Sequence, residues 1–295
     1  MSRRFLAAFL LAAWLVPGGV VAQPVGPTRL QVSGTRFVKA DGAAFEWRGI
    51  TAFRLVEMAA RGREQDVDAY LRWAASKKLT LVRVLAMADV LFQLSPADGQ
   101  HALPRVLDMA RTHGLYVEVV ALADTARIPV DFPRHVKAIG EICARFPNTV
   151  VEIANEPVHP TQAKAIHDPA FLTSLARLIP SGVPVALGST DTSAGGTYVT
   201  WHAPRSSNWP AEIAHGARLV AQFKKPVVSD EPMGAGDTHD PGRRDNVPDR
   251  FRQSAAASRA AGIGATFHYE GGLHAKLPTA TELACLDAWL AGLGA

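Results

Sequence analysis

The sequence feature that most constrains the fold is an alternation of strand-like and helix-like segments that begins near residue 46 and continues along the chain. Short apolar runs are separated by amphipathic segments, a pattern typical of a parallel sheet with helices packed outside it. The predicted strands are residues 45–51, 80–85, 115–121, 149–154, 183–187, 198–202, 226–229 and 263–268. Eight such units predict an α/β fold, the (β/α)8 TIM barrel, which needs about 250 residues.

Helix signals between the strands support this prediction. The segment 103–110 carries apolar residues at helical spacing, with Pro104 near its start. Asp168 and Pro169 indicate another helix start, as N-cap and first-turn proline. One connection, residues 188–197, is shorter than a helical crossover normally requires.

A short N-terminal β-hairpin is expected before the barrel. Residues 30–38 and 43–47 flank Asp41-Gly42, a residue pair that favours a tight turn. We expect the hairpin to close the bottom of the barrel. The sequence has no internal repeat or linker, which predicts one (β/α)8 catalytic domain over residues 23–295.

The first 22 residues have the features of a signal peptide. A basic start precedes an apolar run over residues 5–16, and Val20-Val21-Ala22 offers a small-residue cleavage site. The alternative is a membrane-spanning helix, but residues 17–19 interrupt the run below the ~20 residues such a helix needs. We therefore expect a secreted or periplasmic protein with no stable membrane anchor.

Charge and cysteine content exclude some functions and partners. The net charge is +4, and basic residues form no clustered patch of the kind that nucleic-acid binding requires. No glycine-rich phosphate loop follows a predicted strand, so we expect no nucleotide cofactor. Cys143 and Cys285 are expected to be buried free thiols. We expect a monomer.

The fourth predicted strand ends in Asn155-Glu156-Pro157. In a barrel the active site forms at the carboxyl ends of the strands. A glutamic acid there can protonate a glycosidic oxygen, and the amide can bond the 2-hydroxyl of the sugar. The alternative is an ordinary turn, since asparagine and proline are common in loops.

The seventh predicted strand ends in Asp230-Glu231-Pro232. A second carboxylate there can face Glu156 across the pocket, and a separation of about 5 to 5.5 Å defines a retaining pair. Because strand side chains alternate in direction, only one of the two acids is expected to face the axis, and we favour Glu231. The alternative is a solvated acidic loop.

The strand-end motifs, together with His202 after the sixth strand, resemble glycoside hydrolase clan A, and within it the cellulase-like family 5. The resemblance covers the chain from residue 45 onward. It implies that Glu156 is the acid/base and Glu231 the nucleophile of a retaining β-glycosidase. The same resemblance implies that Arg83 lies beside the nucleophile and that His202 lines the substrate pocket.

Both of these residues have alternative interpretations. Arg83 can instead form an internal ion pair with Glu152 or Glu118, because a charge inside an apolar strand needs a partner. His202 can be a buried core histidine.

The sequence departs from the family pattern at three strand ends. No tyrosine follows His202, residues 121–124 lack the usual strand-three histidine, and the strand-eight tryptophan is replaced by residues 267–270. We expect Tyr269 to supply the stacking surface for the sugar in its place, because aromatic faces suit flat apolar ligands.

Other polar and aromatic residues have weaker signals. Trp201 and Trp209 can form a subsite wall or pack beneath the rim, and Glu57 and Glu270 can bond sugar hydroxyls or be solvated. Metal ligation is not expected, because the candidate histidines are widely spaced: His159, His239 and His274.

The sequence thus favours a retaining glycoside hydrolase that cleaves β-glycosidic bonds in a polysaccharide or oligosaccharide. The alternatives are a non-catalytic carbohydrate-binding barrel and a transglycosylase with the same residues.

Overall fold

The computed structural model describes residues 26–188, 195–202, 209–232, 234–236 and 245–295. Eight parallel strands form one sheet in the order β7-β6-β5-β4-β3-β11-β9-β8. Their bounds are β3 Arg48–Thr51, β4 Leu81–Leu85, β5 Tyr116–Leu122, β6 Thr149–Ala154, β7 Val185–Ala186, β8 Val199–Trp201, β9 Val227–Ser229 and β11 Gly264–Tyr269. A two-residue strand, β10 Gly234–Ala235, pairs with β11. The predicted strands are all present, although several are shorter than expected.

The two ends of this sheet are joined at Val185. Its carbonyl accepts hydrogen bonds from the backbone N–H groups of Thr197 at 2.7 Å and Tyr198 at 3.3 Å, next to the start of β8. These bonds bring β7 to β8 and nearly complete the ring. The predicted (β/α)8 barrel is therefore confirmed. The short fifth-to-sixth connection lies partly outside the described residues.

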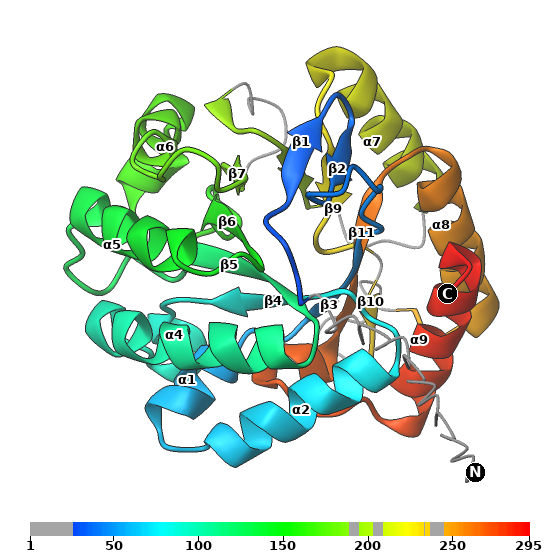
Figure 1. Cartoon of the computed structure of the whole chain (residues 1–295), viewed down its shortest axis with the longest axis horizontal. Helices are drawn as coiled ribbons and strands as arrows, with labels where there is room; N and C mark the ends of the chain where they lie inside the picture. Colours follow the sequence, from blue (N-terminus) through cyan, green and yellow to red (C-terminus); the bar gives the residue numbers. More distant parts are fainter. Residues whose placement is uncertain (1–25, 189–194, 203–208, 233, 237–244) are drawn as a thin grey trace, which may run out of the picture.

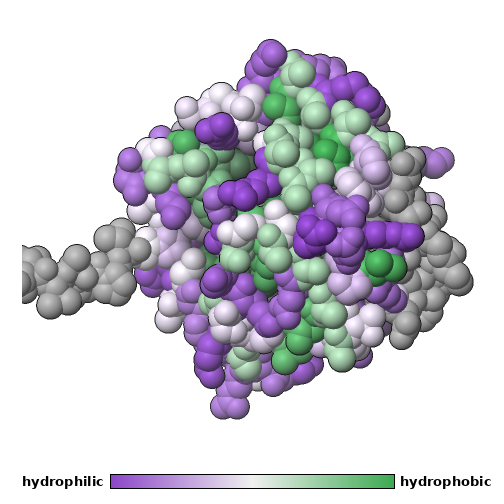
Figure 2. All heavy atoms as spheres, turned by 90° about the vertical axis from the view of Figure 1, so that its right-hand side faces the viewer, coloured by the Kyte–Doolittle hydropathy of each residue, from purple (hydrophilic) through white to green (hydrophobic). Residues whose placement is uncertain are grey.

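Helices surround the strands in chain order (Figure 1). Their bounds are α1 Leu55–Ala60, α2 Glu64–Ser76, α3 Asp89–Phe92, α4 Pro96–Thr112, α5 Phe132–Ala144, α6 Pro169–Ala176, α7 Trp209–Phe223, α8 Pro248–Ala260 and α9 Ala280–Leu293, with 3-10 turns η1 Lys164–His167 and η3 Glu270–His274. Within the described part of the chain, none of the helices has the length and apolar character that a membrane crossing requires. Hydrophilic and hydrophobic side chains are interspersed on the side covered by α7, α8 and α9 (Figure 2).

Helix starts follow the expected capping chemistry, with one correction. Asp168 accepts a hydrogen bond from Ala170 N at 2.9 Å and caps α6, as predicted. Helix α4 begins at Pro96 rather than near Pro104, because the Ser95 side chain caps it by accepting from Asp98 N. Pro104 lies within this helix.

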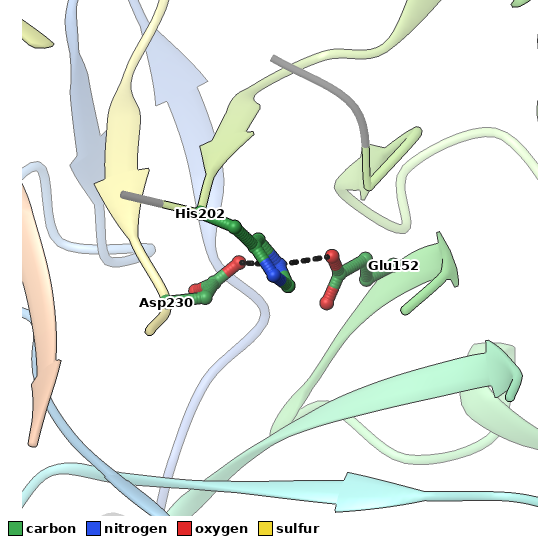
Figure 3. A group of neighbouring side chains, drawn as sticks. All are labelled: Glu152, His202 and Asp230. Atoms are coloured by element: carbon green, nitrogen blue, oxygen red, sulfur yellow. Dashed lines mark hydrogen bonds and ion pairs between the residues drawn. The ribbon is translucent and has the colours of Figure 1, made fainter. Parts of the chain in front are cut away.

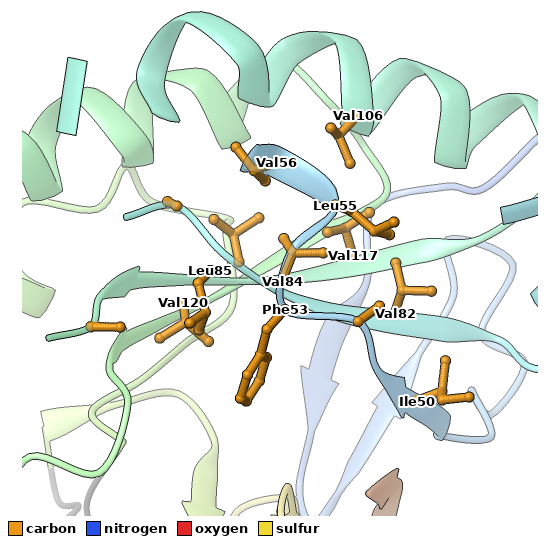
Figure 4. Close-up of a cluster of buried hydrophobic side chains, with 14 of the residues drawn as sticks. Ile50, Phe53, Leu55, Val56, Val82, Val84, Leu85, Val106, Val117 and Val120 are labelled. Carbon is orange, nitrogen blue, oxygen red and sulfur yellow. The ribbon is translucent and has the colours of Figure 1, made fainter. Parts of the chain in front are cut away.

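The main hydrophobic core lies between the barrel and its helices. Outward-facing side chains of β3, β4 and β5 pack against α1 and α4, and Figure 4 shows Val82, Val84 and Val117 beneath Val106 of α4. Cys143 and Cys285 are both free and buried in this core, which confirms the expectation for the two thiols.

A second cluster fills the bottom of the barrel beneath the N-terminal hairpin. Strands β1 Gln31–Ser33 and β2 Arg36–Val38 pair antiparallel, so the hairpin is confirmed. Its turn lies at residues 34–35, where Gly34 has a φ of 58°, and not at Asp41-Gly42. Asp41-Gly42 makes the next tight turn, which leads only to an isolated bridge.

Aromatic rings of the N-terminal segment close the barrel bottom. Phe37, Phe45 and Trp47 pack on inward-facing side chains of the barrel strands. These strand residues are Leu81, Tyr116, Val150, Ala186, Tyr198 and Val228.

The next layer of the barrel interior is polar and charged. Two residues further along five of the same strands, the inward positions hold Arg83, Glu118, Glu152, Thr200 and Asp230. All five are buried, with relative exposure of 0%. The interior of such barrels is usually filled by branched aliphatic side chains. Here, that layer must instead be held together by ion pairs and hydrogen bonds.

The packing of α4 against the end of β4 yields a testable prediction. A Cβ added to Gly99 would lie 1.7 Å from the Ala86 carbonyl oxygen, which directly follows β4. Alanine normally stabilises a helix relative to glycine. Here we expect Gly99→Ala to lower the free energy of unfolding by about 3 kcal/mol, because the helix must shift. Urea denaturation measures this change.

His101→Ala is the control, since His101 is exposed on the same helix. It should change the free energy of unfolding by less than about 0.5 kcal/mol. Equal stability of Gly99→Ala and the wild type would contradict the close packing.

Candidate active site

The sequence-predicted acids meet at the carboxyl end of the barrel. Asn155 and Glu156 follow β6, His202 follows β8, and Glu231 lies two residues after β9. One donor atom from each of Glu156, His202 and Glu231 lies within 4.8 Å of the others. The two glutamates therefore face a common point across the barrel axis.

Arg83 organises this group from the middle of β4. Its Nη1 lies 3.0 Å from Glu231 Oε1, and its Nη2 lies 2.6 Å from Glu152 Oε2. Nη2 also donates to Asn155 Oδ1 at 2.9 Å. The guanidinium carbon lies 5.2 Å from the centroid of the Phe53 ring, a cation–π contact. Both sequence interpretations of Arg83 thus hold, since it contacts Glu231 and forms an internal ion pair.

The backbone at Glu156 is strained. Its φ is 42°, in the left-handed region that non-glycine residues rarely adopt. Neighbouring hydrogen bonds hold it there. Asn155 N donates to Leu122 O at 2.9 Å, Gln162 Nε2 donates to Asn155 O at 2.5 Å, and His159 N donates to Glu156 O at 2.8 Å.

Neighbouring charges shift the pKa values of the inner residues in opposite directions, upward for Arg83 and downward for Glu152. Burial alone would lower the pKa of Arg83, but the surrounding carboxylates, led by Glu152, raise it well above its ordinary value. Burial would raise the pKa of Glu152, but the charge of Arg83 and the His202 hydrogen bond hold it below its ordinary value. Glu152 is therefore ionised at neutral pH.

His202 lies between two acids. Its Nε2 is 3.3 Å from Glu152 Oε1 and 4.0 Å from Asp230 Oδ2 (Figure 3). Burial would lower the pKa of His202, but the Glu152 hydrogen bond and the charge of Glu231 raise it. This histidine belongs to the polar interior of the barrel and not to the apolar core.

The expectation that only Glu231 faces inward is wrong. Counting alternately from the inward-facing Val228 places Asp230 toward the axis, and Asp230 is fully buried there. Glu231 also reaches the interior, because β9 ends at Ser229 and alternation no longer applies beyond it. Both acids of the pair therefore enter the charged interior.

The aromatic expectation for Tyr269 is also wrong, and of the two alternatives for Trp201 the structure shows packing. Tyr269 is fully buried, and its hydroxyl lies 2.8 Å from Tyr70 Oη and 2.6 Å from the Lys276 carbonyl, so it offers no face to a sugar. Trp201 packs outside the barrel in a cluster with Leu219 of α7, and so does not form a subsite wall. Strand alternation explains both, since each side chain points outward.

The remaining weaker candidates have structural roles or stay undecided. Glu57 is buried and ion-paired to Arg54 at 2.7 Å. Trp209 begins α7 and packs partly buried against the main core. His159 accepts or donates at Thr161 Oγ1 within its own loop, while His239 lies outside the described residues.

Two sets of side chains have the donor chemistry of a metal site. They are Glu152, His202 and Asp230, and Glu156, His202 and Glu231, each with donors within 4.8 Å. The Arg83 guanidinium contacts a carboxylate of both sets. A permanent cation at this place repels a metal ion, which argues against a resident metal.

Several residues that support the site are absent from the sequence-based prediction. Tyr198 donates to Glu118 Oε1 at 2.8 Å, Thr200 donates to Glu152 Oε1 at 3.3 Å, and Gln162 holds the Asn155 carbonyl. Tyr198 and Thr200 lie at inward positions of β8, where counting back from His202 by twos would have identified them. Gln162 lies in a loop and carries no such signal.

The charged layer predicts a pH-dependent loss of stability. Arg83→Met leaves buried carboxylates without their cation, and we expect it to lower the free energy of unfolding by about 3 to 5 kcal/mol at pH 8. The loss should be smaller at pH 5, because the remaining carboxylates can then take up protons. Urea denaturation at both pH values measures the difference.

Arg29→Met is the matched control. Arg29 is partly buried, and within the described part of the chain its hydrogen bonds go to uncharged oxygens of Cys143, Ala144 and Thr149. The decrease in the free energy of unfolding caused by Arg29→Met should be similar at pH 5 and pH 8. An equally pH-independent loss for Arg83→Met would contradict the proposed charge balance.

Comparisons with known proteins find solved structures that share this fold. No model of a protein family matches the chain, and no curated protein matches it. Solved structures do match. A β-glucanase from Saccharophagus degradans in complex with cellotetraose is 12% identical, with a TM-score of 0.69 over 94% of this chain and 100% of that one. A glycoside hydrolase family 5 mannosidase from Rhizomucor miehei is also 12% identical, with a TM-score of 0.68 over 90% of this chain and 98% of that one.

A family 5 glycoside hydrolase from Bacteroides vulgatus is 18% identical, with a TM-score of 0.57 over 82% of this chain. This chain spans 62% of the length of that structure, and 60% of another glycoside hydrolase from the same organism. The chain therefore shares the barrel fold of solved glycoside hydrolase family 5 structures, the family that its strand-end motifs resemble.

Proposed function

We propose that this protein is a retaining glycoside hydrolase that cleaves β-glycosidic bonds, with Glu231 as nucleophile and Glu156 as acid/base. The observation that carries the proposal is the approach of the two carboxyl groups, whose nearest oxygens lie within 4.8 Å together with His202. Carboxyl groups about 5 to 5.5 Å apart suit direct attack on the sugar, whereas inverting pairs are more widely separated.

The surroundings of Glu231 suit a nucleophile. Its side chain is 1% exposed, and Arg83 Nη1 lies 3.0 Å from its Oε1. A permanent cation at this distance stabilises the ionised carboxylate and fixes its direction. The carboxylate is thereby prepared to attack the anomeric carbon without a prior proton transfer.

The surroundings of Glu156 suit an acid/base. Glu156 is partly exposed, in contrast to the buried Glu231. An acid/base has to exchange protons with a leaving group and then with water, which partial exposure permits. The strained backbone holds the carboxyl group across the axis from Glu231.

Asn155 is oriented for substrate binding. Its Oδ1 accepts a hydrogen bond from Arg83 Nη2, so its amide NH2 group points elsewhere. An NH2 donor beside the nucleophile can bond the 2-hydroxyl of the sugar, a contact that strengthens in the transition state.

The reaction then proceeds in two displacements. Glu231 attacks the anomeric carbon while Glu156 protonates the departing oxygen, which gives a glycosyl ester on Glu231. Glu156, now ionised, removes a proton from water, and that water displaces Glu231 from the same face that the leaving group occupied. The product keeps the configuration of the substrate.

The substrate class is proposed from the site and from structural neighbours. The similar structures include a β-glucanase bound to cellotetraose and several β-mannanases, which supports β-linked hexose polymers or oligomers as substrates. The basic and apolar N-terminal segment supports action outside the cytoplasm after export.

A substitution experiment tests the assignment of the two acids. With aryl β-glycosides selected from a β-glucan and β-mannan panel, Glu231→Ala should lower kcat by roughly a thousandfold or more. Glu156→Ala should accumulate the glycosyl-enzyme on substrates with activated leaving groups, because only the second step then lacks its base. Added azide should restore turnover of Glu156→Ala, since it attacks without base assistance.

The control is Glu46→Gln, an exposed glutamate at the opposite end of the barrel, which should keep wild-type kcat. NMR of the first anomer released should show the β configuration. Release of the α anomer, or full activity in both alanine variants, would refute the mechanism. Binding of glycans without any turnover by the wild type would indicate a non-catalytic barrel.

A further inference from the structure

The charged layer beneath the proposed catalytic pair contains more acid than its bases can neutralise. Four carboxyl side chains come together there, each 0% or 1% exposed: Glu118, Glu152, Asp230 and Glu231. Arg83 supplies one permanent positive charge, and His202 can supply a second. Among the described residues, two negative charges would then remain uncompensated in a buried site, which is strongly unfavourable.

Hydrogen bonding divides these acids into two groups. Glu152 and Glu231 both receive hydrogen bonds from Arg83, at 2.6 Å and 3.0 Å. By contrast, neither oxygen of Asp230 accepts a hydrogen bond from an N–H group or a hydroxyl of the described residues, and Glu118 Oε2 has only a longer ion pair with Arg83 Nε, at 3.5 Å. Buried carboxylates without donors are rare in native proteins.

The two undersupplied acids are neighbours. The carboxyl groups of Glu118 and Asp230 lie within hydrogen-bonding reach of each other. Two carboxylates at this separation repel, whereas a carboxylic acid and a carboxylate form a strong hydrogen bond through one proton. The remaining oxygen of Glu118 is bonded by Tyr198 Oη at 2.8 Å, which supports its role as the charged acceptor.

We propose that Asp230 is a positioning residue of the active site, whose carboxyl group stays protonated and donates its hydrogen to the Glu118 carboxylate. The shared proton removes one negative charge from the layer. The hydrogen bond gives Glu118 a second donor beside Tyr198 Oη. Arg83 and His202 are then left to hold Glu152 and Glu231.

The acids that face Asp230 favour this arrangement, whereas the charge of Arg83 opposes it. The facing groups are Arg83 of β4, Glu118 of β5, Glu152 of β6, Tyr198 and His202 beside β8, and Glu231 next in sequence. Burial, with the charges of Glu118 and Glu152, raises the pKa of Asp230 well above its ordinary value. Burial and the charge of Glu152 also raise the pKa of Glu118, so the pair of acids retains its shared proton.

This role rests on the proposed function in one respect, its effect on catalysis. Loss of the proton at alkaline pH places a new negative charge 4.0 Å from His202 Nε2 and close to Arg83. That charge competes with Glu231 for both cations, so the nucleophile is held less firmly. The shared proton therefore sets the alkaline limit of activity.

A divalent metal ion would also neutralise the layer, but the contacts favour a proton. His202 Nε2 lies 3.4 Å from Arg83 Nη2, so the guanidinium occupies the side from which a metal would approach Glu152 and His202. A bridging proton needs no additional space between Glu118 and Asp230.

Infrared spectroscopy tests the protonation without any assay of activity. The wild-type protein at pH 6 should show the C=O band of a buried carboxylic acid, and the band should weaken as the pH rises. In Asp230→Asn this C=O band should be weaker, because residue 230 no longer contributes a carboxylic acid. Asp245→Asn is the matched control, because Asp245 is buried but ion-paired to Arg250 at 2.7 Å, and the band should persist.

Stability gives a second measurement with a defined sign. The folded protein holds a proton on Asp230 above the pH at which the unfolded chain releases it, at about 4. The stabilisation is therefore present at low pH and is lost as the pH rises through the folded-state pKa. Between pH 5 and pH 8 the free energy of unfolding should fall less steeply in Asp230→Asn than in the wild type.

Kinetic measurements then distinguish a positioning role of Asp230 from a role in packing alone. Asparagine can donate to Glu118 as the protonated acid does, so Asp230→Asn should keep kcat/KM within about threefold at pH 6 and extend activity to higher pH. Asp230→Ala should lose at least about tenfold at pH 6. Circular dichroism establishes that each variant is folded.

Three results would overturn the proposal. They are a wild-type spectrum without the acid band at pH 6, an Asp230→Asn variant as impaired as Asp230→Ala, and a stoichiometric metal ion that the Asp230→Asn variant no longer retains. Because the spectra and the stability slopes need no substrate, an inactive wild-type protein would refute the proposed function and leave this test intact.

Discussion

The contact on which the rest of the site depends is the set of ion pairs between Arg83 and the acids of the barrel interior. An arginine with 0% exposure cannot be left alone in an apolar barrel, and its five N–H donors need acceptors in fixed directions. Glu152 and Glu231 satisfy these donors from opposite sides, so two distant parts of the chain are joined at one cation. The position of Glu231 follows from the requirements of Arg83.

The fold supports this charged layer from below and from outside. Beneath it, Phe37, Phe45 and Trp47 seal the amino end of the barrel with apolar packing, which excludes water from the lower interior. Outside it, the aliphatic faces of the strands pack against the helices. The charged layer therefore faces the carboxyl end of the barrel, where Glu156 and His202 follow their strands.

Sequence reasoning predicted the barrel well because each of its elements carries a local signal. Apolar runs indicated the parallel strands, and Asp168-Pro169 indicated a helix start. Glu156, His202 and Arg83 were identified because each follows or interrupts such a run. These signals come from periodicity and from the rule that the carboxyl ends of parallel strands share one edge.

The errors arose where a local rule stopped applying. Alternation from the inward-facing Val228 places Asp230 inward, and the rule that only one of the two acids faces the axis fails because β9 ends at Ser229, so Glu231 turns inward as well. An aromatic residue at a strand end suggests a sugar platform, but the place of Tyr269 on β11 turns it toward the helices. Asp41-Gly42 favours a hairpin turn, whereas Gly34 lies between the paired strands. Sequence alone could not decide these cases, because each depends on where a strand ends or which turn is used.

The left-handed backbone at Glu156 bears on which residues evolution can retain at this position. Glycine would adopt that conformation without strain, and a glutamate there costs the fold on the order of 1 kcal/mol. Pressure toward greater stability alone would therefore remove the acid from this site. Its presence, secured by Gln162 and His159, indicates that the molecule accepts a weaker fold in exchange for the carboxyl group it presents.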